Sequence, residues 1–226
     1  MSEKWIVGFA KKAVTPSDYL KTAYYLAGFD RGVRAYDVLD DIFVRSVYFC
    51  ADDSGKGGIV TAVIDCIGLC NKDINEIRAR VYRYLPPDTV SSINIMSTHV
   101  HSAPDTQGLW GKGISCGRNK KYMRYLKEAA AECICSSVAN AKKGKLFFGK
   151  VLTEGMLLDN RLPEVHDDYL NRFRFVPDDS SAELYILNIG CHPELLGENH
   201  HMISADWPCY MGRYIAENTG AEFAFF

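Results

Sequence analysis

The sequence lacks any long hydrophobic run. No stretch approaches the roughly 20 consecutive apolar residues that a membrane-spanning helix needs. The start, MSEKWIVGFAKKAV, is interrupted by Lys11 and Lys12 before a signal-peptide core can form. We therefore expect no transmembrane segment and a cytoplasmic location.

An excess of positive charge is also missing. The 26 Lys and Arg residues are balanced by 28 Asp and Glu residues, which gives a net charge of -2. Because proteins that bind nucleic acid present a basic surface, we do not expect nucleic acid as a partner. The 226 residues are 47% hydrophobic, as in ordinary globular proteins. No repeat, low-complexity tract or long linker divides them, so we expect a single domain over residues 1–226.

Cysteine is plentiful, but the spacing of metal-binding thiolates is absent. None of the eight cysteines forms a CxxC pair, and most lie in apolar stretches such as VIDCIGLC (63–70) and AECICSSV (131–138). Buried thiols that pack as small apolar groups explain this pattern better than disulfides or a thiolate zinc site.

Hydrophobic patterns alternate between strands and helices. Glycine-rich residues 52–58 predict a turn that joins two strands into a hairpin, Asp73 is a candidate helix cap, and Gly144 is placed just past a helix. The chain ends on AEFAFF (221–226), which we interpret as a buried strand cut partway, so that the natural polypeptide continues. The predicted fold is α/β, with mixed β-sheets and helices packed on the outer faces. Strands are predicted at 42–51, 58–67, 92–100, 145–157 and 183–190, and helices at 73–85, 119–141 and 207–220.

The strongest local signal is STHVHSAPD (97–105). His99 and His101 lie two residues apart at the carboxyl end of a predicted strand, so both rings are expected on the same face. Imidazole is the commonest protein ligand of zinc, and a rigid strand end would fix much of its geometry. The alternative is a pair of hydrogen-bonded histidines at a sheet edge.

A second histidine motif has the same form. In ILNIGCHPELL (186–196), His192 follows an apolar strand and precedes a proline and a loop. Two such motifs in one sheet predict that the imidazoles converge on one ion. Catalytic zinc usually has three protein ligands and an open position for water, whose lowered pKa makes it a nucleophile. Spacing alone would choose His101 as the next ligand. The other candidates are Asp65, Asp105, Glu194 and Asp206.

The chain resembles the amino-terminal catalytic part of the neutral, non-lysosomal ceramidase family. STHVHSAPD is similar to the THTHSGP segment of that family, and DNRLP (159–163) to its NRSP-type segment. CHPELL (191–196) and ISADWPCYM (203–211) resemble the second histidine segment and the ISGDNKGY-type stretch. GFAKKAVTP (8–16) and GFDRGV (28–33) resemble the start of the family sequence. Together the segments span residues 8 to 211.

The resemblance implies zinc-dependent hydrolysis of an amide bond in a small-molecule or lipid substrate, such as a sphingolipid. It implies that His99 and His192 are zinc ligands and that His101 hydrogen-bonds substrate. Arg161 corresponds to an arginine that lines the active site, although a surface salt bridge would also explain it.

The remaining site residues lie in the same matched segments. Asp206 is either a partner that orients a ligand histidine or a helix cap. Tyr210 is expected to contact substrate, and Asn160 to shape the turn that carries Arg161.

The chain departs from the family pattern at several points. The glycine that follows the H-x-H proline in the family is Asp105 here. The glutamate and tyrosine zinc ligands of the family are expected beyond Phe226. The rival hypotheses are a metallohydrolase with a non-lipid substrate and a non-catalytic binding module with the same fold. Two such classes, metallo-β-lactamases and amidohydrolase barrels, place their histidines differently.

Overall fold

The part of the chain that the structure describes builds one eight-stranded sheet, three helices and a small two-stranded sheet. The computed structural model describes residues 4–51 and 54–226. The order of strands in the large sheet is β10-β8-β7-β6-β1-β3-β4-β5, and β2 pairs with β9. The strands are β1 Lys4–Ala13, β2 Asp37–Val38, β3 Phe43–Cys50, β4 Gly58–Ile64, β5 Val90–Ser97, β6 Lys142–Leu152, β7 Tyr169–Pro177, β8 Leu184–Asn188, β9 Met202–Ile203 and β10 Glu222–Phe225, and the helices are α1 Asn71–Tyr84, α2 Lys120–Ala139 and α3 Trp207–Thr219.

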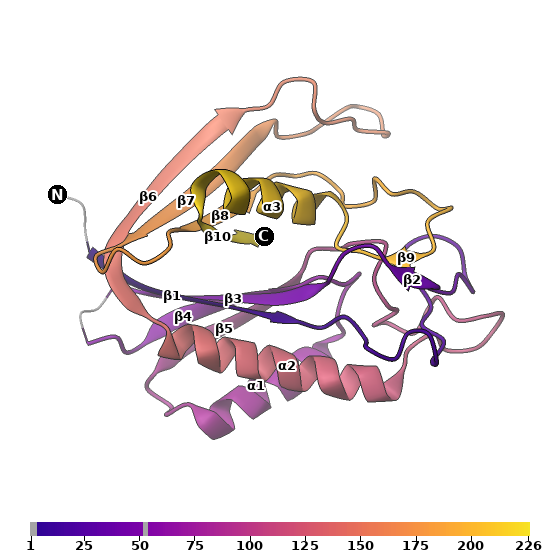
Figure 1. Cartoon of the computed structure of the whole chain (residues 1–226), viewed down its shortest axis with the longest axis horizontal. Coiled ribbons are helices and arrows are strands. Elements are labelled where there is room, and N and C mark those ends of the chain that lie inside the picture. The colour runs from indigo at the N-terminus through magenta and orange to yellow at the C-terminus, as the bar shows by residue number, and fades with distance from the viewer. Residues whose placement is uncertain (1–3, 52–53) are drawn as a thin grey trace.

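The sheet is bent, and helices cover it from two sides (Figure 1). Strands β1, β3, β4 and β5 form one half, and α1 and α2 lie together against its outer face. Strands β6, β7, β8 and β10 rise away as the other half, with α3 on the opposite side of the molecule from α1 and α2. The loops after β5, β6 and β8 all lie at the same end of the molecule.

The sheet is mixed, as the sequence predicts. Parallel pairs, β4 with β5 and β8 with β10, occupy its two ends, while the strands between them pair antiparallel. An α/β fold with a mixed sheet and outer helices is therefore confirmed. Two strands, β1 and β7, did not stand out in the sequence, because lysine and arginine side chains interrupt their apolar pattern.

Burial explains most of the element positions. The main core lies between α1, α2 and the strands they cover, and includes the fully buried Ile77, Leu126 and Ile134. A second cluster around Val47 and Phe175 joins the two halves of the sheet. Among the thiols in the apolar stretches, Cys50, Cys66 and Cys133 are buried as predicted, whereas Cys70 is exposed and Cys135 is half-buried. None of the helices in the described residues is both long and apolar enough to cross a membrane.

Several predicted boundaries are wrong. Helix α1 begins at Asn71 with Cys70 at its N-cap position, so Asp73 lies inside the first turn and does not cap the helix. Gly144 lies within β6, which begins at Lys142 directly after α2, since pairing with β1 and β7 takes over the residues after the helix. The hairpin of β3 and β4 is confirmed. Part of its predicted turn, residues 52–53, lies outside the described residues.

Candidate metal centre

Three histidines come together at the end of the molecule where the loops gather. His99, His101 and His192 each offer a ring nitrogen, and these potential ligand atoms all lie within 4.8 Å of one another. The ring centroids are 5.0 Å apart for His99 and His192, 5.3 Å for His99 and His101, and 4.5 Å for His101 and His192. The predicted convergence of the two motifs is therefore present in the fold.

The two motifs reach this point from distant parts of the sheet. Strand β5 is the outermost strand at one end, whereas β8 is next to the outermost strand at the other end. The bend of the sheet brings their loops together, and the backbone N–H of His101 donates to the carbonyl of Pro193 at 3.2 Å. This bond joins the His101 loop directly to the His192 loop.

The backbone, not strand alternation, aims the first two rings. Strand β5 ends at Ser97, and His99 has a φ of 64°, in the left-handed region. The expectation that His99 and His101 share one face of a strand is therefore wrong. Backbone bonds from Thr98 to Ile64 (3.0 Å) and from His99 to Cys66 (3.1 Å) hold the turn against the end of β4. A non-glycine residue held at positive φ is characteristic of functional sites.

Two of the rings present Nδ1 to a protein oxygen, His99 through a hydrogen bond and His192 through a close contact with a carboxylate. The Nδ1 of His99 lies 2.7 Å from the carbonyl oxygen of Ile67, which can only accept, so this nitrogen carries the proton. The Nδ1 of His192 lies 3.1 Å from a carboxylate oxygen of Glu194. Both contacts leave Nε2 with a free lone pair. This is the state in which imidazole binds a metal ion.

His101 forms the buried base of the site. Its side chain is 8% exposed, and neither ring nitrogen has a hydrogen-bond partner among the described residues. Burial, together with the nearby His192, lowers the pKa of His101 to about 4, so the ring is neutral at neutral pH. Gly28 and the ring of Phe29 pack against it, with 4.9 Å between the aromatic centroids. A buried, neutral imidazole with unused nitrogens suits a ligand or a hydrogen-bonding role equally well.

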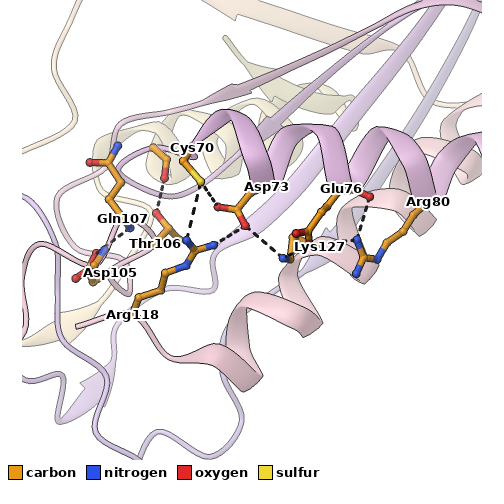
Figure 2. A network of polar contacts seen from close by, with 11 residues as sticks. Cys70, Asp73, Glu76, Arg80, Asp105, Thr106, Gln107, Arg118 and Lys127 are labelled. Carbon is orange, nitrogen blue, oxygen red and sulfur yellow. Dashed lines mark hydrogen bonds and ion pairs between the residues drawn. The ribbon is translucent and has the colours of Figure 1, made fainter. Parts of the chain in front are cut away.

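The loop that supplies the Ile67 carbonyl is fixed by a polar network (Figure 2). Thr106 donates to the carbonyl of Gly68 at 2.5 Å, directly beside Ile67. At the end of the same loop, the Cys70 thiol donates to Asp73 at 2.8 Å, and Asp73 also binds Arg118 and Lys127.

Asp73 is the centre of this network. Its carboxylate is 2% exposed. Burial raises the pKa of Asp73, but the hydrogen bonds from Cys70, Arg118 and Lys127 outweigh burial and lower the pKa overall. The loop that holds His99 is therefore fixed, at its Cys70 end, by the buried carboxylate of Asp73, which binds three side chains.

Two carboxylates considered as ligands have other partners. Asp65 accepts hydrogen bonds from Arg45 and from the backbone of Phe43, both at 2.8 Å. Asp105 accepts from the backbone N–H groups of residues 107, 108 and 110 at 2.6 to 2.9 Å. Asp105 thus organises the loop after the H-x-H segment.

Asp206 lies behind the His192 loop. It is fully buried and caps α3 through the backbone N–H of Trp207 at 2.6 Å. Its two oxygens also accept from the backbone of Leu195 and Leu196, at 3.2 and 3.1 Å. Asp206 therefore caps α3 and also binds the backbone of the loop that carries His192.

The other predicted site residues lie farther out. Tyr210 is 46% exposed on α3, and the Arg213 guanidinium lies 4.5 Å from its ring centroid. Arg161 and Asn160 are exposed in the loop between β6 and β7. The Asp159 carboxylate holds that turn by accepting from the backbone of residues 161 and 165, both at 3.0 Å. Sequence reasoning did not identify Gly28, the Ile67 carbonyl or Asp159.

Comparison with known proteins supports the fold. No protein-family model and no curated protein sequence matches the chain. Among solved structures, the neutral ceramidase from Pseudomonas aeruginosa matches with a TM-score of 0.83 at 15% identity, covering 100% of this chain and 38% of that one. A ceramidase complexed with C2 matches with a TM-score of 0.80 at 17% identity, covering 98% of this chain and 37% of that one.

The resemblance read from short motifs is therefore confirmed at the level of the fold. The chain spans less than two fifths of the length of either ceramidase. Its eight-stranded sheet, with a histidine cluster where the loops meet, has the fold of part of neutral ceramidase.

Proposed function

We propose that this chain is the histidine-bearing part of a zinc-dependent hydrolase that cleaves the amide bond of an N-acyl substrate. The observation that carries the proposal is the cluster of three imidazoles from two separate loops, with all potential ligand atoms within 4.8 Å. The ceramidase fold supports the same chemistry. A lipid amide of the ceramide class is the substrate we expect, and in this proposal residues 1–226 form a single domain that carries part of the catalytic site.

The donor set suits a borderline-soft divalent ion such as zinc. His99 and His192 would hold the ion, because their Nδ1 atoms face protein oxygens and their Nε2 atoms remain available. The buried ring nitrogens of His101, which have no partner among the described residues, are consistent with a role toward an ion or a substrate. Zinc at such a site supplies Lewis-acid chemistry, polarising a carbonyl group and making water acidic enough to attack it near neutral pH.

The protein side chains would orient the substrate. His101, at the base of the site, would hydrogen-bond the substrate. Arg161, from the loop between β6 and β7, would bind a polar head group or the negative charge that develops on the carbonyl oxygen. Asp206 would keep the His192 loop in place, Tyr210 would contact substrate from α3, and Asn160 would shape the turn before Arg161.

Two imidazole ligands leave the coordination of zinc incomplete. We propose that the remaining ligands come from residues beyond Phe226. The lengths of the two ceramidases, which are more than twice that of this chain, are compatible with such a contribution.

The test is zinc-dependent release of a free amine from an N-acyl sphingosine, measured on the natural protein that contains this chain. We expect release that stops on chelation and returns with zinc. His99→Ala and His192→Ala should abolish it, whereas His166→Ala, a change in the loop between β6 and β7, should leave it intact. A zinc-loaded protein that releases no amine would favour the binding-module hypothesis.

A further inference from the structure

The carboxylate of Glu194 lies against two of the three rings. One oxygen is 3.1 Å from Nδ1 of His192, and the other is 3.6 Å from Nδ1 of His101. The group of mutually close ligand atoms consists of the three histidines and does not include Glu194. Glu194 therefore contacts two of the rings at Nδ1, and it is not a fourth member of the group of potential metal ligands.

His99 also presents its Nδ1 atom to a protein oxygen. Its Nδ1 faces the carbonyl oxygen of Ile67 at 2.7 Å. In each of the three rings, the Nδ1 edge is thus the edge that faces a protein oxygen. An imidazole that donates from Nδ1 keeps its lone pair on Nε2, because a neutral ring carries only one proton.

From this geometry we infer that Glu194 is a positioning residue that fixes His192, and on ligand binding His101, as Nδ1–H tautomers with Nε2 directed at the ion. The inference rests on the proposed function for the identity of the ion, but the tautomers can be measured without it. The contact to His192, at 3.1 Å, is within ion-pair distance. The contact to His101 is longer than a hydrogen bond, and such contacts tighten when a site is occupied.

The backbone around Glu194 is built to hold this position. Its N–H donates to the carbonyl of His192 at 3.0 Å, which closes a tight turn. The carbonyl of His192 also accepts from the indole N–H of Trp207 at 3.3 Å. The next two residues are bound by Asp206. Carboxylate-to-histidine contacts of this kind typically change metal affinity by about 10- to 100-fold when they are removed.

The first measurement is nitrogen-15 NMR of the intact chain without metal, with labelled histidine, which reports the tautomer of each ring. We expect His192 to be protonated at Nδ1 in the parent protein. In Glu194→Ala it should revert to the Nε2–H form that free imidazole side chains prefer, while His99 stays unchanged. Glu194→Gln, which keeps the shape and one acceptor oxygen, should retain part of the Nδ1–H form. The control Glu198→Ala removes an exposed carboxylate from the same loop.

The second measurement is zinc affinity by competition with a chromogenic chelator. We expect about a 10- to 100-fold loss for Glu194→Ala, a smaller loss for Glu194→Gln, and no more than about a twofold change for Glu198→Ala. Unchanged histidine tautomers in both Glu194 variants would overturn the inference, even if zinc binds. X-ray absorption that finds a carboxylate oxygen on zinc in the parent, lost in Glu194→Gln, would overturn it too, because Glu194 would then be a ligand. Absence of zinc binding by the parent, with the expected tautomers, would instead count against the proposed function alone.

Discussion

Gly28 packs against His101, so a substitution at Gly28 perturbs the site without changing any of its three histidines. Gly28 has a φ of +114°, and a Cβ at this position would lie 2.5 Å from Nδ1 and 2.6 Å from Cβ of His101. Cγ of His101 would lie closer still, and ordinary contact begins at 3.4 Å, so Gly28→Ala must displace the ring or the glycine backbone by more than about 0.9 Å. Overpacking of a core costs roughly 1–3 kcal/mol and a left-handed residue with a Cβ roughly 1–2 kcal/mol, so we expect a loss of about 3 kcal/mol.

Two assays measure the consequences of Gly28→Ala. For a chain of this length, about 3 kcal/mol corresponds to a fall of roughly 6–12 °C in melting temperature. The His101 ring lies against the rings of His99 and His192, with centroids 5.3 and 4.5 Å apart, so its displacement should shift these two ligands. Because metal sites tolerate ligand shifts of only about 0.2 Å, we also expect zinc affinity to fall about tenfold or more. Gly113→Ala is the matched control, since Gly113 also has a positive φ (+60°) but nothing lies within 4 Å of its Cβ position. Parent-like stability and zinc affinity in Gly28→Ala would refute the close packing of His101 on this segment.

Three further predictions concern the supports of the site. Asp73→Asn leaves Arg118 without its carboxylate partner and leaves Lys127 paired with Glu76 alone, and we expect a loss of about 3 kcal/mol in urea unfolding; an effect below about 1 kcal/mol would contradict this. Because the folded-state pKa of Asp73 is lowered, its stabilising effect is complete above the unfolded-state value of 3.8 and is lost as the pH falls through the folded value. The parent should therefore lose stability below about pH 4 more steeply than Asp73→Asn, and parallel pH profiles would argue against the network. Asp206→Ala removes the α3 cap and two loop bonds, so thermal unfolding should show a loss of about 2–4 kcal/mol, while a neutral effect would contradict the assigned contacts.

The sequence predicts the elements better than it predicts how they meet. The patterns around β3, β4, α2, α3 and β8 are strong because apolar residues are frequent in these segments and many of them are buried. The sequence pattern does not predict the β1 and β7 strands, because lysine and arginine side chains interrupt their apolar periodicity. Asp73 has the residue type of a cap, but it lies inside the first turn of α1, and its carboxylate binds tertiary partners on α2 and in the loop before α2.

The histidines were identifiable, but their geometry was not. A motif of strand, histidine and proline marks His99 and His192 as residues at strand ends. It cannot reveal that β5 and β8 lie near opposite ends of the sheet order and meet because the sheet bends. Likewise, the positive φ of His99 and the backbone carbonyl of Ile67 leave no trace in residue types. Glu194 was visible as a carboxylate near His192, but only the three-dimensional contacts distinguish a supporting residue from a ligand.

The central claim is that the imidazoles of His99 and His192 belong to one metal site. Zinc titration of the natural protein that contains this chain, by competition with a chromogenic chelator, tests it most directly. The parent and His166→Ala should bind one zinc ion per chain with equal affinity, and the His99→Ala, His192→Ala double variant should lose that binding. A double variant that binds zinc as tightly as the parent would contradict the claim.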